Sequence, residues 1–367
     1  MLLDRAYRQM AAPAIASVFE HHPSGSPLIA VAPERNLDFL RAVAVLLVVV
    51  CHLFGVSART RAWPLPHELG TTGVLIFFVH TSLVLMLSMQ RMKHPGDLAF
   101  ASTFYVRRFF RIYPLSIVTV TLVFSLGIPE RALAVFEHPT KLEWISNLLL
   151  FQNLARARSA IAPLWSLPWE VQMYVALPVI FILLNRIRYR AAVIVSLSLV
   201  AGLLSISGWN VVFKLLTYTP CFFGGVLAYV LLRSKPNLSA KLWPAAMLIL
   251  LSGYLSYRLW APQAEYPAWL LCTALGLAIP QFRDLAEGPL TKAAHAVAKY
   301  SYGIYLAHVP VIWLAFDHFR GLPVPARVLI FLAGVVGVPF LAYHLIEAPM
   351  IGIGKRFSFG SVRPASQ

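Results

Sequence analysis

The chain has 367 residues, of which 59% are hydrophobic and only 13% are charged, and its mean hydropathy is +0.70. An average soluble domain carries about a quarter charged residues, so this composition excludes a soluble globular enzyme and a disordered chain. It predicts an all-α polytopic membrane protein. The formal net charge of +16 favours either a nucleic-acid partner or basic residues gathered in cytoplasmic loops.

Stretches of about 20 apolar residues can cross a bilayer as helices, and we expect a bundle of about ten such transmembrane helices. Residues 144–153 form a further apolar segment that is too short to span, and we expect it to lie at the interface or to re-enter the membrane. The ten predicted spans are 37–56, 70–89, 112–128, 163–184, 191–208, 211–232, 242–259, 268–282, 300–319 and 325–347.

The positions of the basic residues give the orientation. With the N-terminus inside, 20 of the 31 Lys and Arg residues lie in inside segments and 9 in outside segments. Because short cytoplasmic loops are enriched in basic residues, we expect both termini in the cytoplasm and no nucleic-acid partner. The expected organisation is a cytoplasmic leader at 1–34, a transmembrane domain at 35–350 and a basic cytoplasmic tail at 351–367.

The three cysteines, Cys51, Cys221 and Cys272, all lie in apolar runs. They indicate no disulfide framework and no metal cluster, and we expect no metal site. The first residues of the chain lack the apolar core of a signal peptide. We therefore expect the leader to be short and partly disordered.

The first predicted span carries an arginine and a histidine on one face. Arg41 and His52 are 11 residues apart, which at about 100° per residue leaves them only about 20° apart around the helix. Along the axis they lie about 16 Å apart. Asp38 precedes Arg41 by three residues and is placed to pair with it. The alternative is that Arg41 reaches the cytosolic interface and His52 bonds a neighbouring carbonyl.

The segment PLWSLPWEVQMY places Glu170 about two turns into the fourth predicted span. This depth is similar to that of His52, and a carboxylate beside an imidazole fixes its tautomer and raises its basicity. Glu170 is thus a candidate partner of a general base, or else it points to outside water. Trp165 and Trp169 are either anchors at the membrane interface or contacts for a substrate.

A basic and aromatic cluster, FYVRRFFRIYP, precedes the third predicted span. Arg108 and Arg111 are three residues apart and would share a helical face, with Arg107 beside them. Guanidinium groups suit phosphates, so these residues are candidates for holding a phosphorylated donor. The alternative is retention of the loop in the cytosol together with binding of lipid phosphates.

Two further histidines lie in predicted spans. His80 follows an apolar run, and either a hydrogen bond between helices or a contact with substrate would account for it. His308 lies near Tyr305, and both are candidates for lining a substrate cavity. The pair Gly224 and Gly225 predicts close packing of helices.

With these residues in view, the chain resembles the integral-membrane acyltransferase family 3, which includes bacterial O-antigen and exopolysaccharide O-acetyltransferases. The resemblance covers roughly residues 35–356, with six motifs in the family's order. The matching elements are RNLDFLRAVAVLLVVVCH with Arg41 and His52, GTTGVLIFFV, RRFFRIYP with Arg108 and Arg111, PLWSLPWEVQMY with Trp165, Ser166, Leu167 and Glu170, YSYGIYLAHVPV with Ser301, Tyr302, Tyr305, Leu306 and His308, and HLIEAPMIGIGKR with Ile346, Glu347 and Pro349.

The resemblance implies a multi-pass enzyme of the bacterial cytoplasmic (inner) membrane, with acyl-CoA as co-substrate and no tightly bound cofactor. Such an enzyme transfers an acyl group, usually acetyl, to a carbohydrate hydroxyl at or across the membrane. It implies a catalytic role for His52 with Arg41 beside it, and a donor-binding role for Arg108 and Arg111. The chain departs from the family where Ile-Ser-Gly-Phe commonly follows FFV, because here His80 begins the sequence His-Thr-Ser-Leu.

We therefore expect His52, oriented by Glu170, to act as a general base on the acceptor hydroxyl or to carry the acyl group transiently. Arg41 and His52 would serve opposite ends of one tunnel. Buried charges also suit a proton-coupled transporter or a flippase of a sugar or lipid-linked substrate, and a structural partner in a polysaccharide assembly complex is a third alternative. The acceptor, the acyl chain length and the oligomeric state stay open.

Overall fold

A computed structural model of the chain describes residues 34–57, 65–92, 96–128, 138–207, 216–232, 236–261 and 266–357. The regular secondary structure of this described part is helical, with one isolated β-bridge between Leu238 and Phe282. The prediction of an all-α chain is confirmed to that extent. Residues 1–33 of the expected leader and residues 358–367 of the expected tail lie outside the described residues.

Within the described residues, five helical segments are long and apolar enough to cross a membrane, and two shorter apolar helices accompany them. They make the chain a multi-pass membrane protein, while the number of ten spans and the cytoplasmic position of the termini stay predictions. The five are α2 (Glu34–Ser57), α3 (Leu65–Gln90), α4 (Asp97–Leu126), η1 with α7 (Ala162–Ser166 and Leu167–Arg186), and α13, η6 and α14 in succession (Val324–Ala342, Tyr343–Glu347 and Ala348–Phe357), and the two shorter ones are α8 (Arg190–Ile206) and α9 (Thr219–Leu231).

Other helices complete the bundle. The segment expected to be too short to span forms two small helices, α5 (Lys141–Leu148) and α6 (Gln152–Ala155). The later predicted spans correspond to α10 (Trp243–Trp260), α11 (Tyr266–Ala278) and α12 (Pro289–Trp313), the last of which continues into a π-helical turn, η5 (Leu314–His318).

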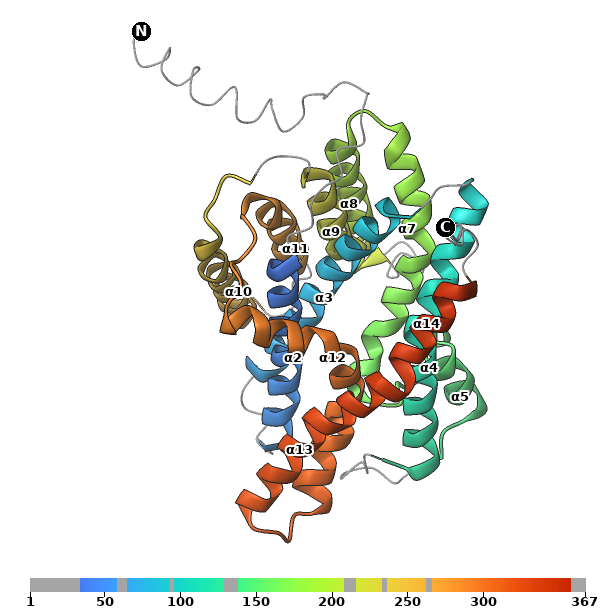
Figure 1. The fold of residues 1–367 in the computed structure, drawn as a ribbon, viewed down its shortest axis with the longest axis vertical. Coiled ribbons are helices and arrows are strands. Elements are labelled where there is room, and N and C mark those ends of the chain that lie inside the picture. The colour runs from blue at the N-terminus through green and yellow to red at the C-terminus, as the bar shows by residue number, and fades with distance from the viewer. Residues whose placement is uncertain are drawn as a thin grey trace, which may run out of the picture.

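Helix α3 lies at the centre of the bundle (Figure 1). It is the most buried of the five candidate spans, because its surface is apolar nearly all round and so has no face suited to water. It packs against α2 on one side and against α9 and α11 on another, while α12 packs against α2. In Figure 1, α10 and α11 lie on one side of α3, and α4 and α14 lie on the other.

Two adjacent glycines let the central helices approach closely. A Cβ atom at Gly224 would collide with the carbonyl of Cys272 on α11, and one at Gly225 would collide with the carbonyl of Val79 on α3. The prediction of close packing at this glycine pair is therefore confirmed. The contact fixes α9 between α3 and α11 and leaves the other side of α3 for the site described below.

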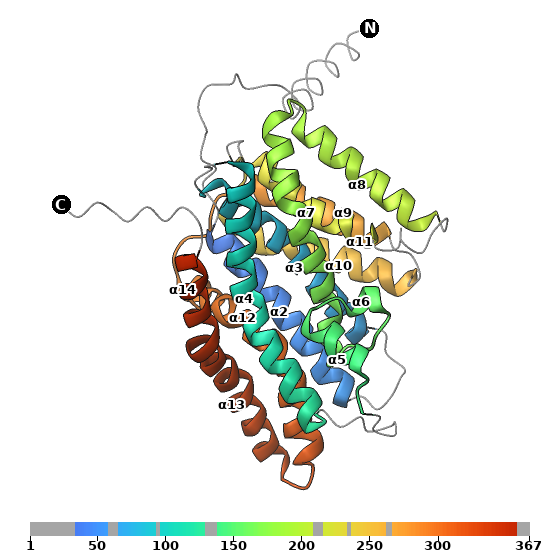
Figure 2. The ribbon, with the colours of Figure 1, turned by 90° about the vertical axis from the view of Figure 1, so that its right-hand side faces the viewer.

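The last long segment lies at the outside of the bundle. Only 11% of the apolar stretch within this segment is buried, and α13 forms one edge of the molecule in Figure 2. Exposed apolar side chains along such a segment suit contact with lipid rather than water. Further along, α14 returns to the bundle, and Gly354 packs against the side chain of Phe110 on α4.

Candidate active site

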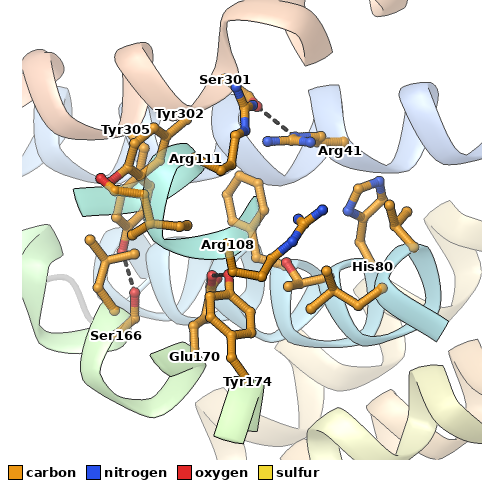
Figure 3. Close-up of a pocket in the computed structure, with 16 residues that line it drawn as sticks. Arg41, His80, Arg108, Arg111, Ser166, Glu170, Tyr174, Ser301, Tyr302 and Tyr305 are labelled. Atoms are coloured by element: carbon orange, nitrogen blue, oxygen red, sulfur yellow. Dashed lines mark hydrogen bonds between the residues drawn. The ribbon is translucent and has the colours of Figure 1, made fainter. Parts of the chain in front are cut away.

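A polar cavity lies where α2, α3, α4, α7 and α12 meet, and we call it the arginine cavity (Figure 3). It holds about 80 Å³, and three of its lining side chains are arginines. Charged side chains at membrane depth are costly and are retained where they serve a function. Its polar lining consists of Arg41, His80, Thr81, Arg108, Arg111, Ser166, Glu170, Tyr174, Ser301, Tyr302 and Tyr305.

Arg41 reaches this cavity from α2. Its Nε donates a hydrogen bond of 2.6 Å to Oγ of Ser301 on α12, and Ser301 donates to the carbonyl of Ala298 at 2.8 Å. Ser301 is fully buried, so the bond fixes the guanidinium across the interface between α2 and α12. Figure 3 shows the Arg41 side chain between Ser301 and His80. The sequence identified Arg41 but gave no role to Ser301.

The arginines of the RRFFR motif lie inside a helix instead of ahead of one. Helix α4 begins at Asp97, 15 residues before the predicted start of the third span at residue 112. Hydropathy detects only the apolar half of α4, which is why the start was misplaced. Arg108 and Arg111 line the arginine cavity, whereas Arg107 is not among the side chains that line it.

Arg108 offers a hydrogen-bond donor to this cavity. Its Nε is buried and has no hydrogen-bond partner among the described residues, and its guanidinium lies 5.9 Å from the centre of the Phe104 ring. A buried donor without a partner is costly unless a ligand meets it. In Figure 3 the guanidinium extends into the space between Glu170, Arg41 and His80. Arg108 is therefore well placed to contact a bound anion.

Arg111 is fixed by a carboxylate from the C-terminal part of the chain. Its Nη1 donates to Oε2 of Glu347 at 2.7 Å, and the Glu347 side chain is only 1% exposed. Glu347 ends the π-helical turn η6, whose wider winding places it against α4. Glu347 matched the last family motif, but no partner was assigned to it from the sequence.

Glu170 does not hold His52. Its Oε2 accepts a hydrogen bond of 2.7 Å from Tyr174, one helical turn further along α7, and both side chains line the arginine cavity. The hydrogen bonds described for His52 go to other residues, so the expected pair of Glu170 and His52 is not formed. The depth of a residue in a span, estimated from uncertain helix ends, does not fix how neighbouring helices are rotated.

His52 lines a second space, which we call the histidine cavity. This cavity holds about 420 Å³ and lies between the C-terminal half of α2, the N-terminal half of α3 and η1. Arg41 and His52 share one face of α2, as expected, but each faces a different cavity. The lining consists of Val48, Cys51, His52, His67, Gly70, Thr71, Val74, Ala162, Pro163, Trp165, Tyr218 and Tyr305.

The side chain bonded to His52 is another histidine. His52 Nδ1 lies 2.9 Å from the carbonyl oxygen of Val48 and 3.3 Å from Nε2 of His308 on α12. The two rings meet edge to face, with their centres 4.9 Å apart. His308 is fully buried and is not among the side chains that line either cavity. This placement favours support of His52 over contact with substrate.

Tyr305 is the side chain that the two cavities share. Its hydroxyl donates to the carbonyl of Pro163 at 2.6 Å, so the bond of 2.7 Å between Tyr305 and Ser166 is donated by the serine hydroxyl. Ser166 is buried at the junction of η1 and α7. The pair forms a polar partition between Arg41 and His52.

Aromatic side chains gather at the histidine cavity. Trp165 and Tyr218 both line it, with ring centres 5.6 Å apart, and Trp169 packs against Tyr218 at 5.1 Å. Trp165 is thus placed to contact a ligand, while Trp169 is not among the side chains that line this cavity and packs against the ring of Tyr218. Tyr218 was missed because it lies inside the predicted span 211–232, where an aromatic side chain is an ordinary packing residue.

The three residues of the His-Thr-Ser sequence on α3 have different surroundings. The hydroxyl oxygen of Ser82 lies 2.7 Å from the carbonyl oxygen of Phe222 on α9 and 2.8 Å from that of Phe78, so its single hydrogen is shared between two helices. His80 is 4% exposed and, together with Thr81, lines the arginine cavity. His80 therefore has the position of a ligand contact.

Comparison with known proteins places the chain in a family. A family model described as an acyltransferase domain matches residues 34–344, which contain both cavities. ORF330 of Acidianus two-tailed virus, provisionally named an acetyltransferase, is 26% identical over 294 residues, covering 75% of this chain and 84% of the viral protein. No solved structure matches the chain significantly.

Two bacterial relatives carry similar names. BcsY of Komagataeibacter xylinus, provisionally named a membrane-bound transacylase, is 26% identical over 345 residues, covering 86% of this chain and 82% of that protein. The acyltransferase MdmB of Streptomyces mycarofaciens is 30% identical over 171 residues, covering 42% of this chain and 41% of MdmB.

Proposed function

The chain belongs to the integral-membrane acyltransferase family 3 and is a membrane-embedded O-acyltransferase, and on that premise we propose that it transfers an acetyl group from cytosolic acetyl-CoA to a hydroxyl of a cell-surface or lipid-linked carbohydrate. We place it in the bacterial cytoplasmic membrane with the N-terminal end of α2 toward the cytosol. One observation carries the proposal: an arginine-lined cavity and a histidine-bearing cavity share the wall formed by Tyr305.

In the proposed reaction the donor enters through the arginine cavity. Among the described residues, the cavity and its ion pair bring together Arg41, Arg108 and Arg111 with Glu170 and Glu347 as counter-charges. This excess of cations suits a phosphate or the thiolate that leaves an acyl-CoA. The cavity holds only about 80 Å³, so it suits part of the thin pantetheine arm of coenzyme A, while the nucleotide stays outside.

His52 is the proposed base. The carbonyl of Val48 accepts a hydrogen bond from Nδ1, which leaves the lone pair of Nε2 available to take a proton. The acceptor hydroxyl gives its proton to Nε2 as its oxygen attacks the thioester carbonyl carbon. The C–S bond then breaks, and the proton passes from Nε2 to the departing sulfur. His52 thereby acts as base and then as acid.

Tyr305 and Ser166 stand on the proposed path of the thioester. Arg41 and His52 lie about 16 Å apart along α2, so a donor held by the arginines must extend past this pair to meet the base. A rotation of the tyrosine side chain would break its bonds to Ser166 and Pro163 and join the cavities. Transfer then takes place in one connected space.

The acceptor is proposed to bind in the histidine cavity. The cavity has room for a sugar ring, and Trp165 and Tyr218 offer apolar ring surfaces beside polar groups. Such surfaces pack against the C–H groups of a sugar while polar atoms bond its hydroxyls. Pocket shape and aromatic lining support a carbohydrate acceptor, and the relatives' names leave its identity open.

The test uses the purified protein in lipid nanodiscs with isotopically labelled acetyl-CoA and surface glycan from a deletion strain. We expect label in the glycan, a mass increase of one acetyl group on a defined sugar, and loss of transfer in His52→Ala. His318→Gln, at an exposed position beyond α12, should transfer normally. Near-normal transfer by a correctly inserted His52→Ala protein would exclude His52 as the base, and movement of substrate without acylation would contradict the whole proposal.

A further inference from the structure

Two histidines from distant parts of the chain meet across the interface of α2 and α12. His52 Nδ1 and His308 Nε2 are 3.3 Å apart, although 256 residues separate the two in sequence. Each ring also faces the carbonyl one turn before it in its own helix: Nδ1 of His52 lies 2.9 Å from the oxygen of Val48, and Nδ1 of His308 lies 3.0 Å from that of Ile304.

These carbonyls assign the ring protons. A carbonyl oxygen only accepts hydrogen bonds, so Nδ1 must carry the hydrogen in both rings. The Nε2 atom of neutral His308 is then a hydrogen-bond acceptor, and the nearby donor is the Nδ1–H group of His52. This one hydrogen is shared between two acceptors, Nε2 of His308 and the carbonyl oxygen of Val48. The Nε2 atom of His52 has no such restraint and keeps its lone pair.

The opposite assignment fails on both sides of the pair. If His308 carried its hydrogen on Nε2 and donated to His52, both Nδ1 atoms would present lone pairs to carbonyl oxygens at 2.9 and 3.0 Å. Two contacts between acceptors would replace two hydrogen bonds inside a site that excludes water at His308, which is fully buried. The two carbonyls therefore select one arrangement of the pair.

We propose that His308 is a positioning residue for the transfer reaction: its Nε2 accepts a hydrogen bond from the Nδ1–H of His52 and so directs the Nε2 of His52 toward the acceptor hydroxyl. The inference rests on the proposed role of His52 as the base. When His52 takes the acceptor proton on Nε2, the new positive charge is shared with Nδ1–H, and the lone pair of His308 stabilises it. His308 itself gains and loses no proton.

A neutral imidazole thus stands where hydrolases of other folds use a carboxylate. The carboxylate expected for this task, Glu170, bonds Tyr174 and lines the other cavity. The separation has a physical reason. A carboxylate beside His52 would add a negative charge to a site at membrane depth, whereas His308 supplies an acceptor without a charge.

The first arm of the test is kinetic. We compare His308→Leu, which removes the acceptor, with His308→Gln, whose side-chain oxygen can accept the same bond, in nanodiscs with labelled acetyl-CoA. For His308→Leu we expect kcat to fall on the order of 10-fold to 100-fold, less than the ~10⁴-fold loss that follows a wrong histidine tautomer, because the Val48 carbonyl still holds Nδ1–H. The KM for acetyl-CoA should stay unchanged, and His308→Gln should recover part of the loss.

The second arm does not depend on catalysis. Nitrogen NMR of protein labelled at histidine, with the His52 signals assigned by comparison with His52→Gln, reports which ring nitrogen carries hydrogen. We expect Nδ1–H in the wild type, a weaker Nδ1–H hydrogen bond in His308→Leu and recovery in His308→Gln. The exposed His318→Leu variant is the matched control and should leave both readouts unchanged.

The outcomes separate the two claims. Equal kcat values for wild type, His308→Leu and His308→Gln would overturn the positioning role. Nitrogen NMR signals of His52 that are unchanged by both substitutions would overturn it as well. A loss that appears only in the KM for acetyl-CoA would also overturn it. If His52→Ala transfers normally while the NMR signals respond to His308→Leu, the hydrogen bond exists and it is the proposed function of His52 that fails.

Discussion

Ser166 and Tyr305 are joined by a hydrogen bond of 2.7 Å at the wall between the arginine cavity and the histidine cavity. The bond links the junction of η1 and α7 to α12, and the tyrosine hydroxyl is further held by the carbonyl of Pro163. A partition made of a side chain can open without moving a helix. In the proposed reaction, this partition would also keep water that enters with the acceptor away from the thioester.

Tyr305→Phe should therefore uncouple hydrolysis from transfer. The variant keeps the ring but loses both hydrogen bonds of the hydroxyl, which leaves Ser166 without its partner. A net hydrogen bond contributes about 1 kcal/mol, so the two lost bonds amount to about 2 kcal/mol. At about 1.4 kcal/mol per factor of ten, hydrolysis of acetyl-CoA without acceptor should rise roughly 30-fold relative to transfer. Release of free coenzyme A with and without glycan measures this ratio.

The control for that experiment is Tyr302→Phe. Tyr302 lines only the arginine cavity, and its hydroxyl donates to the carbonyl of Ile112 at 2.8 Å. Loss of this hydroxyl removes a hydrogen bond from the same helix but leaves the partition intact. A similar rise in hydrolysis for both variants would show that the Tyr305 hydroxyl has no separate role in the wall.

Arg108→Gln should weaken donor binding more than Arg107→Gln does. Arg108 lines the arginine cavity with a buried Nε that lacks a partner among the described residues, whereas Arg107 is not among the lining side chains. Hydrogen bonds to charged groups contribute about 1.5–3 kcal/mol, so the KM for acetyl-CoA should rise roughly 10-fold to 100-fold in Arg108→Gln. Equal effects of the two substitutions would argue that the cation cluster acts only through its summed charge.

Glu347→Leu should strongly destabilise the protein. It removes the partner of Arg111 inside the bundle, where the two side chains are 1% and 20% exposed. Breaking a buried ion pair from one side costs about 3–5 kcal/mol, and replacing both partners by apolar residues is often neutral. The double variant Arg111→Met with Glu347→Leu should recover thermal stability in detergent without recovering transfer. A double variant no more stable than Glu347→Leu would contradict this interpretation.

Outside the spans, Glu143 should stabilise the segment of α5 and α6 in a pH-dependent manner. The hydrogen bond from the Arg158 guanidinium, helped by the backbone N–H of Thr140, lowers the pKa of Glu143 from 4.5 to about 2. Because the folded pKa is depressed, this stabilisation is fully present above pH 4.5 and is lost as the pH falls toward about 2.

Hydrogen exchange across residues 138–161 measures this effect. Glu143→Gln should exchange faster than wild type at pH 6, and the difference should shrink as the pH is lowered below 4.5. The control is Asp97→Asn, which breaks the pair of Asp97 with Arg186 at a position where both side chains are more than half exposed. Exposed pairs contribute about 0–1 kcal/mol, so little change is expected there, and a difference at Glu143 that persists at pH 2 would exclude its ionisation as the cause.

The sequence predicts features that depend on one helix at a time. Periodicity alone places Arg41 and His52 on one face of α2 at two depths, and the structure shows each facing a cavity at its own depth. The close packing at Gly224 and Gly225 is likewise a property of small residues wherever helices cross. Neither conclusion needs the positions of other helices.

The sequence does not predict the contacts between helices, because these contacts depend on how each helix is rotated about its own axis relative to its neighbours. His52 was paired with Glu170 from estimated depth, yet α12 brings His308 to it, and Glu170 bonds Tyr174 within its own helix. The start of α4 was misplaced because its first half is too polar for a hydropathy signal. The number of ten spans stays a prediction, since five helical segments of the described part of the chain are long and apolar enough to cross a membrane.

The π-helical turn at Tyr343–Glu347 makes the spacing of the C-terminal segment part of the site. This turn holds one more residue than an α-helical turn would. Deleting any residue within it would rotate everything beyond by about 100°, which would carry Glu347 away from Arg111 and change the phase at which Gly354 meets Phe110. A change of length within η6 would therefore do two kinds of damage at once: it would separate Glu347 from Arg111 and move α14 out of its packing against α4.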